Sequence, residues 1–171
     1  CKESVESMIG VIKAYVISDV QSLSGDLSFH DFYTFEHAIN VAMYSISIFK
    51  ALKPEASDKE LTMAGLGGLL HDLGKIQIPT RIINNPGKLS DEDFAVIKQH
   101  PGFGDELLKK QCEDGQCQHE GVDFEIIRRV VNEHHENYNG TGYPNKLKES
   151  EIHVFARIVA IADFYDAITT K

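Results

Sequence analysis

Histidine and aspartate side chains that could share metal ions recur along this chain. His71 and Asp72 stand next to each other after the apolar run Gly67-Gly68-Leu69-Leu70. A buried polar group without a partner costs roughly 1–3 kcal/mol, and a divalent cation would satisfy an imidazole and a carboxylate together. We expect folding to bring five more residues of these two types to this pair: His37, His100, His134, His135 and Asp163.

The distribution of the histidines favours a buried site over scattered surface residues. Any single histidine is more often an ordinary core or surface residue than a ligand. Here five of the 8 histidines have apolar neighbours, and the other three, His30, His119 and His153, stand in polar segments. Ligands of nitrogen and oxygen without thiolate favour iron, manganese, nickel or zinc. Seven ligands suit two ions about 3.5–4 Å apart, bridged by Asp72, which is an arrangement for in-line attack on a phosphodiester.

The segments that carry these residues are expected to be helical. Apolar residues recur at helical spacing, and no long stretch alternates with period two, so we expect a nearly all-α domain. The expected helices cover about 5–23, 31–52, 57–72, 90–109, 123–136 and 150–166. Gly65, Gly67 and Gly68 each cost roughly 1 kcal/mol in a helix relative to alanine, so we expect a neighbouring helix to approach them closely.

Composition narrows the class of protein. The chain has 171 residues and 42% hydrophobic content, enough for one domain that buries about 70% of its unfolded surface. A formal charge of −9 argues against a partner such as duplex nucleic acid. The sequence contains no run of about 18 or more apolar residues, which a membrane-spanning helix would need. We expect a cytoplasmic protein. Cys112, Cys117 and His119 form either a small separate metal site or, as we favour, a solvated loop with reduced thiols.

Several motifs in order resemble one known family. His37, His71-Asp72 and Asp163 are similar to the pattern of the HD superfamily of metal-dependent phosphohydrolases. The longer segments resemble its HD-GYP subfamily; they are Leu70-His71-Asp72-Leu73-Gly74-Lys75, His100-Pro101-Gly102, His134-His135-Glu136, Gly140-Thr141-Gly142-Tyr143-Pro144 and the run from Ala156 to Ala167. The resemblance extends from about His37 to the end of the chain. It implies an HD-domain bundle of about six to eight helices with a metal site between them.

The resemblance also implies an activity and a role for each matching residue. Members hydrolyse cyclic di-GMP to linear pGpG or GMP in bacterial second-messenger signalling. Two divalent metals, iron or manganese and otherwise nickel or zinc, would supply a bridging hydroxide. One metal would bind His37, His71, Asp72 and Asp163, and the other His100, His134, His135 and Asp72. Lys75 would contact a substrate phosphate and act with Asp72 in catalysis, and the loop of Gly142, Tyr143 and Pro144 would shape the pocket mouth. Asp166 would either touch a guanine or be a carboxylate of the surface or of a helix network.

Three departures from the family pattern bear on the site. Tyr33 stands where some members have a glutamate that can hold a third metal, so we expect two metals. The family segment Glu-Arg-x-Asp-Gly reads Glu136-Asn137-Tyr138-Asn139-Gly140 here, which removes a cation and an anion at the pocket edge. The chain stops at Lys171, before a further family segment that helps to bind the nucleotide, so we expect the site to be completed beyond it.

Alternatives to hydrolysis of cyclic di-GMP stay open from the sequence. The altered segment around Asn137 and Asn139 favours a second substrate, 3′,3′-cGAMP. A different class of function is a silent module that binds metal and nucleotide and signals through a partner. We expect residues 1–30 to form a helix and connector from an upstream region and residues 31–171 to form the HD-GYP domain. An upstream sensor or receiver domain and a homodimer are further expected partners.

Overall fold

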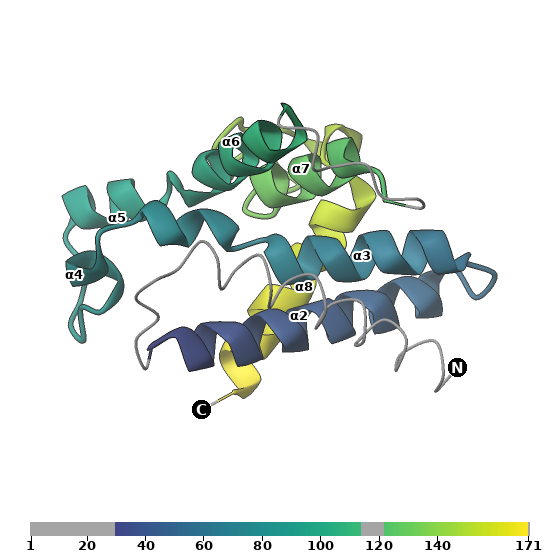
Figure 1. Ribbon diagram of the computed structural model, residues 1–171, viewed down its shortest axis with the longest axis horizontal. Coiled ribbons are helices and arrows are strands. Elements are labelled where there is room, and N and C mark those ends of the chain that lie inside the picture. The colour runs from purple at the N-terminus through teal and green to yellow at the C-terminus, as the bar shows by residue number, and fades with distance from the viewer. Residues whose placement is uncertain (1–29, 114–121, 171) are drawn as a thin grey trace. The chain divides into compact units, whose positions relative to one another are not determined.

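The computed structural model describes residues 30–113 and 122–170 of the chain. Regular structure in these ranges is helical, and its β-structure there is a single bridge between Asn139 and Lys148. The elements are α2 (His30–Leu52), α3 (Asp58–Leu70), η1 (Leu73–Gln77), α4 (Thr80–Ile83), α5 (Asp91–Ile97), α6 (His100–Glu113), α7 (Phe124–Glu133), η2 (Glu149–Glu151) and α8 (Val154–Thr169) (Figure 1). The prediction of an all-α bundle is confirmed. The expected helix at 5–23 lies outside the described residues.

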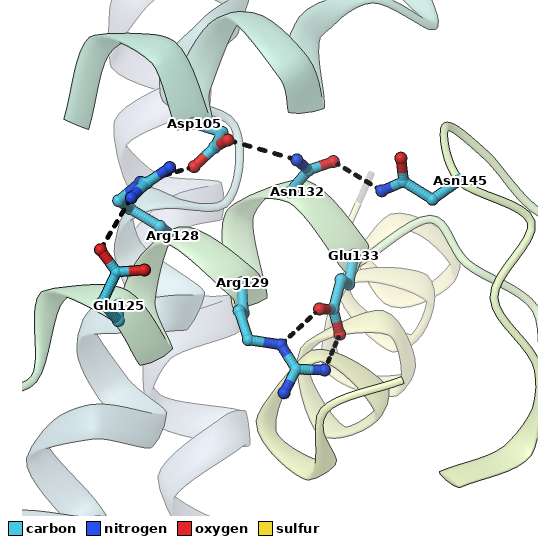
Figure 2. Close-up of a pocket in the computed structure, with 7 residues that line it drawn as sticks. All are labelled: Asp105, Glu125, Arg128, Arg129, Asn132, Glu133 and Asn145. Atoms are coloured by element: carbon cyan, nitrogen blue, oxygen red, sulfur yellow. Dashed lines mark hydrogen bonds and ion pairs between the residues drawn. The ribbon is translucent and has the colours of Figure 1, made fainter. Parts of the chain in front are cut away.

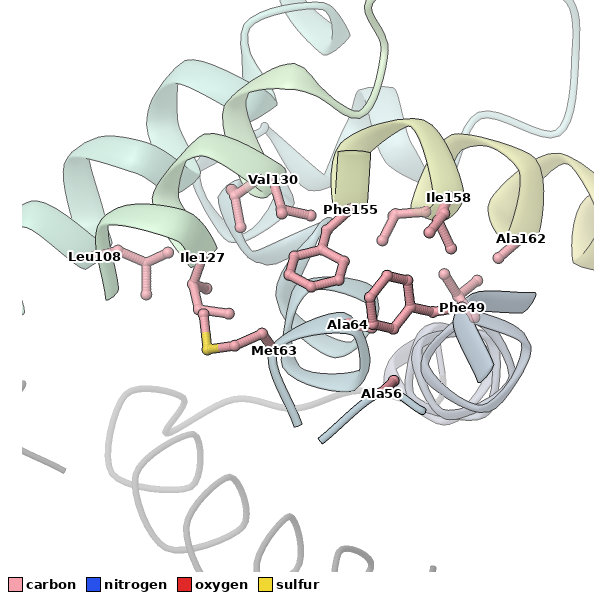
Figure 3. Packing of buried hydrophobic residues seen from close by; sticks show 13 residues of the cluster. Phe49, Ala56, Met63, Ala64, Leu108, Ile127, Val130, Phe155, Ile158 and Ala162 are labelled. Carbon is pink, nitrogen blue, oxygen red and sulfur yellow. The ribbon is translucent and has the colours of Figure 1, made fainter. Parts of the chain in front are cut away.

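The hydrophobic core lies where α3, α7 and α8 meet the part of α2 that follows His37. Helix α3 packs against both α7 and α8, and α6 packs against α7 and η1. Phe49 of α2 and Phe155 of α8 meet edge to face with ring centroids 4.9 Å apart, and Ile127 and Val130 of α7 are fully buried (Figure 3). Edge-to-face contact is a favoured geometry for aromatic pairs. This core fixes the helices from which the histidines and aspartates project.

Helix α3 begins and packs as the sequence predicts. Ser57 forms a capping box with Glu60, in which each side chain bonds the backbone N–H of the other residue. The glycines allow close packing, because a Cβ atom at Gly68 would lie 2.9 Å from the Cα of Ala42 in α2. The predicted approach of a neighbouring helix is therefore confirmed at Gly68, and it brings His37 and His71 towards each other.

The predicted helix over 90–109 is wrong in one respect, because the chain forms two helices there. Helix α5 ends at Ile97, and α6 begins at His100. Pro101 has no N–H to donate to the Ile97 carbonyl, which is the bond that would continue the first helix. The ring of His100 replaces that donor, with Nδ1 2.8 Å from the Ile97 oxygen. The break therefore sets the direction of the His100 side chain.

Two short helices replace predicted loop structure between α3 and α5. The chain continues past His71 into η1, and α4 follows Pro79, where the sequence predicts a loop. Helix α8 begins at Val154 after a 3₁₀ turn, later than predicted. Across the described ranges, none of the helices combines the length and apolar character that crossing a bilayer requires.

Candidate metal centre

Five helices and helix ends converge on one group of histidines and aspartates. His71 and Asp72 follow the last residue of α3, His37 lies within α2, and His100 is the first residue of α6. The other three are His134 and His135, directly after α7, and Asp163 in α8. The structure thus brings together all seven residues that the sequence predicts as metal ligands.

Asp72 joins two sets of side chains through its two different carboxylate oxygens. Its Oδ2 lies 3.3 Å from the Nε2 of His71 and 3.9 Å from the Nε2 of His37. Its Oδ1 lies 3.3 Å from the Nε2 of His100 and 4.0 Å from the Nε2 of His134. One carboxylate therefore faces two separate clusters of nitrogen ligands, which is the geometry of a bridging ligand.

Each cluster has enough ligands for an ion. The ligand atoms of Asp72, His100, His134 and His135 lie within 4.8 Å of one another, and so do those of His37, His71 and Asp72. Asp163 completes the second cluster, with its Oδ1 3.2 Å from the Nε2 of His37 and 3.9 Å from the Nε2 of His71. We call the cluster of His37, His71, Asp72 and Asp163 cluster A, and that of Asp72, His100, His134 and His135 cluster B.

Backbone carbonyls orient three of the histidine rings. The Nδ1 atoms of His71, His100 and His134 donate to the carbonyl oxygens of Gly68, Ile97 and Val131, at 2.6, 2.8 and 2.8 Å. In each case the carbonyl belongs to the residue three positions earlier. With the hydrogen on Nδ1, the lone pair is on Nε2, and Nε2 is the atom that points to Asp72. Such outer hydrogen bonds commonly fix the tautomer of metal-binding histidines.

The nitrogen atoms at the centre lack the partners that buried polar groups require. The buried Nε2 of His71 has no hydrogen-bond partner within the described part of the chain. The Nε2 atoms of His100 and His134 lie 3.2 Å apart. With both hydrogens on Nδ1, two lone pairs face each other, and they repel unless a cation or a proton lies between them. These residues fit a divalent cation, because it would relieve both defects.

Burial keeps His134 and His135 of cluster B neutral. Burial lowers the pKa of His134 well below its ordinary value, and the neighbouring histidines lower it further. Burial and His100 lower the pKa of His135 to about 4. Burial alone would raise the pKa of Asp72, but His71, His100 and Lys75 outweigh it and hold this pKa well below the ordinary value. Neutral imidazoles around an ionised carboxylate are the protonation states that metal binding requires.

Lys75 places a positive charge at the edge of the same site. Its Nζ lies 2.6 Å from the Oδ2 of Asp72, and 38% of the lysine side chain is exposed. Because Lys75 lies in η1, one turn after Asp72, the 3₁₀ turn that the sequence did not predict directs this amine back to the carboxylate. The ammonium group can therefore reach an anionic ligand at the mouth of the site.

The loop after His135 is built on a buried carboxylate. Glu136 accepts the backbone N–H groups of Asn145 at 2.5 Å and Leu147 at 3.1 Å. Gly142 is needed for close approach, because a Cβ there would lie 2.5 Å from the Cα of Glu136. The ring of Tyr143 then stacks on His135 with centroids 4.8 Å apart. The sequence motif pointed to Gly142 and Tyr143 but did not reveal this role of Glu136.

Asp166 lies inside the helix packing. It is fully buried, its Oδ2 is 2.7 Å from the Nδ1 of His37, and its Oδ1 accepts the hydroxyl of Thr170 at 3.0 Å. The contact with His37 agrees with the alternative of a carboxylate within a helix network, and the contact with a guanine stays a prediction. Its position three residues after Asp163 in α8 puts both aspartates on the side that faces His37.

A depression of about 120 Å³ is lined by residues of α6 and α7 and by Asn145 (Figure 2). It shares no residue with clusters A and B. Its two arginines are already paired: Arg128 with Asp105 at 2.8 Å, and Arg129 with Glu133 at 2.6 Å. This region therefore has a structural role, since Arg129 also donates to the carbonyl of Glu151.

The cysteine-containing segment is covered only in part. Cys112 is disulfide-bonded, so the expectation of reduced thiols is wrong for this residue. Cys117 and His119 lie outside the described residues.

The chain is similar in sequence to phosphodiesterases of two bacteria. The chain is 38% identical over 140 residues to a cyclic di-GMP phosphodiesterase of Pseudomonas aeruginosa, which covers 82% of this chain and 31% of the relative. It is 33% identical over 115 residues to 3′3′-cGAMP-specific phosphodiesterase 2 of Vibrio cholerae, covering 67% of this chain and 20% of the relative. The chain thus spans less than a third of the length of these relatives.

Structural and family comparisons agree with these relatives. A solved structure, Bd1817, described as an HDG"Y"P protein from Bdellovibrio bacteriovorus, superposes with a TM-score of 0.63 at 28% identity and covers 91% of this chain and 48% of that one. The family model for the HD domain matches residues 22–171. The chain therefore belongs to the HD domain family and is of the HD-GYP type.

Proposed function

We propose that this domain is a metal-dependent phosphodiesterase that hydrolyses cyclic di-GMP to pGpG or GMP. The observation that carries the proposal is the position of Asp72, whose two oxygens face clusters A and B separately. The named activity of the relative from Pseudomonas aeruginosa supports the choice of substrate.

The ligands favour two divalent transition metals, iron or manganese first and nickel or zinc second. Clusters A and B would hold these ions, which would supply an activated water for attack on the phosphorus and positive charge beside the phosphate. Asp72 acts in catalysis by bridging clusters A and B, and its low pKa keeps it ionised for that role. A side-chain nucleophile is not required.

Lys75 is assigned to the phosphate of the substrate. Its ammonium group lies at the edge of cluster A and is partly exposed, so it can add a positive charge where negative charge grows in the transition state. Tyr143 stacks on His135 beside cluster B, and burial together with Asp72 and Asp163 raises the pKa of its phenol to about 12, so the phenol stays protonated. Gly142, Tyr143 and Pro144 would line the mouth of the pocket on that side.

A second substrate, 3′,3′-cGAMP, is favoured by the uncharged edge of the loop. Asn137 donates to the hydroxyl of Thr141 at 3.1 Å, and Asn139 accepts both the N–H and the hydroxyl of Thr141. These amides stand where the family pattern has an arginine and an aspartate, and they are used within the loop. The named specificity of the relative from Vibrio cholerae also supports this substrate.

The test is a product assay on anaerobically purified, metal-analysed protein with the two substrates side by side. We expect pGpG or GMP from cyclic di-GMP at a higher kcat/KM than hydrolysis of 3′,3′-cGAMP. The reverse order would move the assignment to 3′,3′-cGAMP. Stoichiometric nucleotide binding without any product from either compound, in fully metallated protein, would refute hydrolysis and leave the silent binding module.

We also propose a division of the chain into two parts, an upstream regulatory domain and a homodimer. Residues 31–171 would form the phosphodiesterase domain, and residues 1–30 a helix and connector from an upstream region. A response regulator of Xanthomonas campestris named as a cyclic di-GMP phosphodiesterase is 37% identical over 112 residues, which supports an upstream receiver or sensor domain. A homodimer is the further partner that we propose, and light scattering of the full protein tests it.

A further inference from the structure

The Nδ1 of His37 bonds to a side chain, whereas the Nδ1 atoms of three other histidines of the metal centre bond to backbone carbonyls. His71, His100 and His134 stand at helix ends, where backbone carbonyls are free to accept from their Nδ1 atoms. His37 lies inside α2, where the bonds between successive turns of the helix occupy the carbonyls. Its Nδ1 therefore needs an acceptor from another element.

Asp166 of α8 supplies that acceptor. Its Oδ2 lies 2.7 Å from the Nδ1 of His37, and it is fully buried. Its other oxygen accepts the hydroxyl of Thr170 at 3.0 Å, and this residue follows the end of α8. Both carboxylate oxygens thus have fixed partners, so the carboxylate cannot turn away from His37.

The chemistry of this contact decides which nitrogen of His37 can bind a metal. In this contact the Asp166 oxygen accepts the hydrogen bond and the ring nitrogen donates it, so the Nδ1 of His37 carries the hydrogen. The lone pair of the neutral ring is then on Nε2, which lies 3.2 Å from the Oδ1 of Asp163 and 3.9 Å from the Oδ2 of Asp72. Without the carboxylate, nothing in this contact would favour that tautomer over the one with the hydrogen on Nε2.

We propose that Asp166 is a positioning residue that fixes the tautomer and orientation of His37 for metal binding in cluster A. The inference rests on the proposed function, because it requires that clusters A and B each bind an ion. Asp166 touches neither substrate nor metal in this role. Loss of such an outer hydrogen bond typically weakens metal affinity by about 10–100-fold, and here the loss is confined to the ion of cluster A.

Two variants test the proposal by metal binding rather than by turnover. Asp166→Asn replaces one oxygen by an amide that can donate to Nδ1, and Asp166→Leu removes hydrogen bonding while keeping an apolar group of similar size. Metal-free protein is titrated with Mn²⁺ and with Zn²⁺, and the helical content of each variant is checked by circular dichroism. In Asp166→Leu we expect the ion of cluster B to bind as in the wild type. We expect the ion of cluster A to bind about 10–100-fold more weakly.

A spectroscopic signature separates positioning from general loosening of the fold. In the Zn²⁺-loaded wild type, nitrogen NMR of labelled histidines should show His37 protonated at Nδ1 and bound through Nε2, and this pattern should be lost or mixed in Asp166→Leu. Asp105→Asn is the matched control, because the Asp105 carboxylate pairs with Arg128 in the depression lined by α6 and α7. It should leave both affinities and the His37 signals unchanged.

The results distinguish this inference from the proposed function. Two ions bound with wild-type affinity in both variants, with unchanged His37 signals, would overturn the role of Asp166 and leave the metal centre intact. A wild type that binds no ions would overturn the proposed function, and the role of Asp166 would fall with it.

Discussion

Gly74 is the point at which a single methyl group should disrupt the site through the backbone. It lies in η1, two residues after Asp72, and η1 packs on α6. A Cβ atom at Gly74 would overlap the carbonyl oxygen of His100 and lie 2.5 Å from the nitrogen of Gly104 and 2.9 Å from the carbonyl carbon of His100. All three atoms belong to the backbone, so a change of side-chain rotamer cannot relieve the overlap.

The magnitude follows from these distances. Ordinary contact begins near 3.4 Å, so η1 and α6 would have to separate by about 1 Å or more. Overpacking costs about 1–3 kcal/mol where side chains can adjust, and we expect Gly74→Ala to cost about 3 kcal/mol or more. For a chain of this size that lowers Tm by about 6 °C or more. The same displacement moves His100 relative to Asp72, and a 1 Å misplacement can lower turnover by about 10²-fold.

Gly102→Ala is the matched control for Gly74→Ala. It lies in the first turn of α6, and a Cβ atom there meets nothing within 4 Å. Replacing a helical glycine by alanine in open space stabilises by about 0.5–1 kcal/mol, so Tm should rise by about 1–4 °C. Thermal unfolding by circular dichroism and metal analysis measure both variants. If Gly74→Ala kept the wild-type Tm and bound two ions, the close packing of η1 on α6 would be refuted.

Further substitutions test other parts of the account. Asp72→Ala should abolish turnover with helical content retained, because both clusters lose their shared ligand; nearly normal turnover would remove the bridging role. Lys75→Met should lower kcat/KM by about 10²-fold with two ions still bound, and an unchanged kcat/KM would exclude phosphate contact. The hydrogen bond to Lys53 lowers the pKa of Glu60 to about 2, from 4.5. Its stabilising contribution is therefore complete above pH 4.5 and lost towards pH 2, so Glu60→Gln should be less stable at pH 7 and match the wild type near pH 2 in urea unfolding. Phe155→Ala should cost about 3–5 kcal/mol, measured by the same unfolding, and a loss below about 1 kcal/mol would contradict the core position of this ring.

Much of the fold followed from local signals in the sequence. The helix expected from residue 57 begins there, with Ser57 as its cap, and the glycines before His71 predict the close approach of a neighbouring helix, which is α2. Helix α2 was harder to orient, because apolar residues occur on most of its circumference. Met43 is apolar but 46% exposed, whereas Val41 and the polar Ser45 are fully buried. A broad apolar distribution does not determine which residues face the core.

In the metal centre, the sequence indicates the residue types but not the hydrogen bonds between distant residues. The sequence motifs indicated the seven residues of clusters A and B, because their types and order carry the chemistry. The hydrogen bonds behind them depend on backbone paths, such as the break before His100 that leaves the Ile97 carbonyl free. The contact between His37 and Asp166 joins residues 129 positions apart. Pairings over that separation arise from tertiary packing, which helical periodicity does not encode.

Anomalous X-ray diffraction from crystals of Mn²⁺-loaded protein tests the central claim most directly. We predict two manganese peaks about 3.5–4 Å apart, one within cluster A and one within cluster B, with one oxygen of Asp72 directed to each. A single peak, no peak, or peaks away from Asp72 would contradict the bridged pair of cations on which the proposed hydrolysis depends.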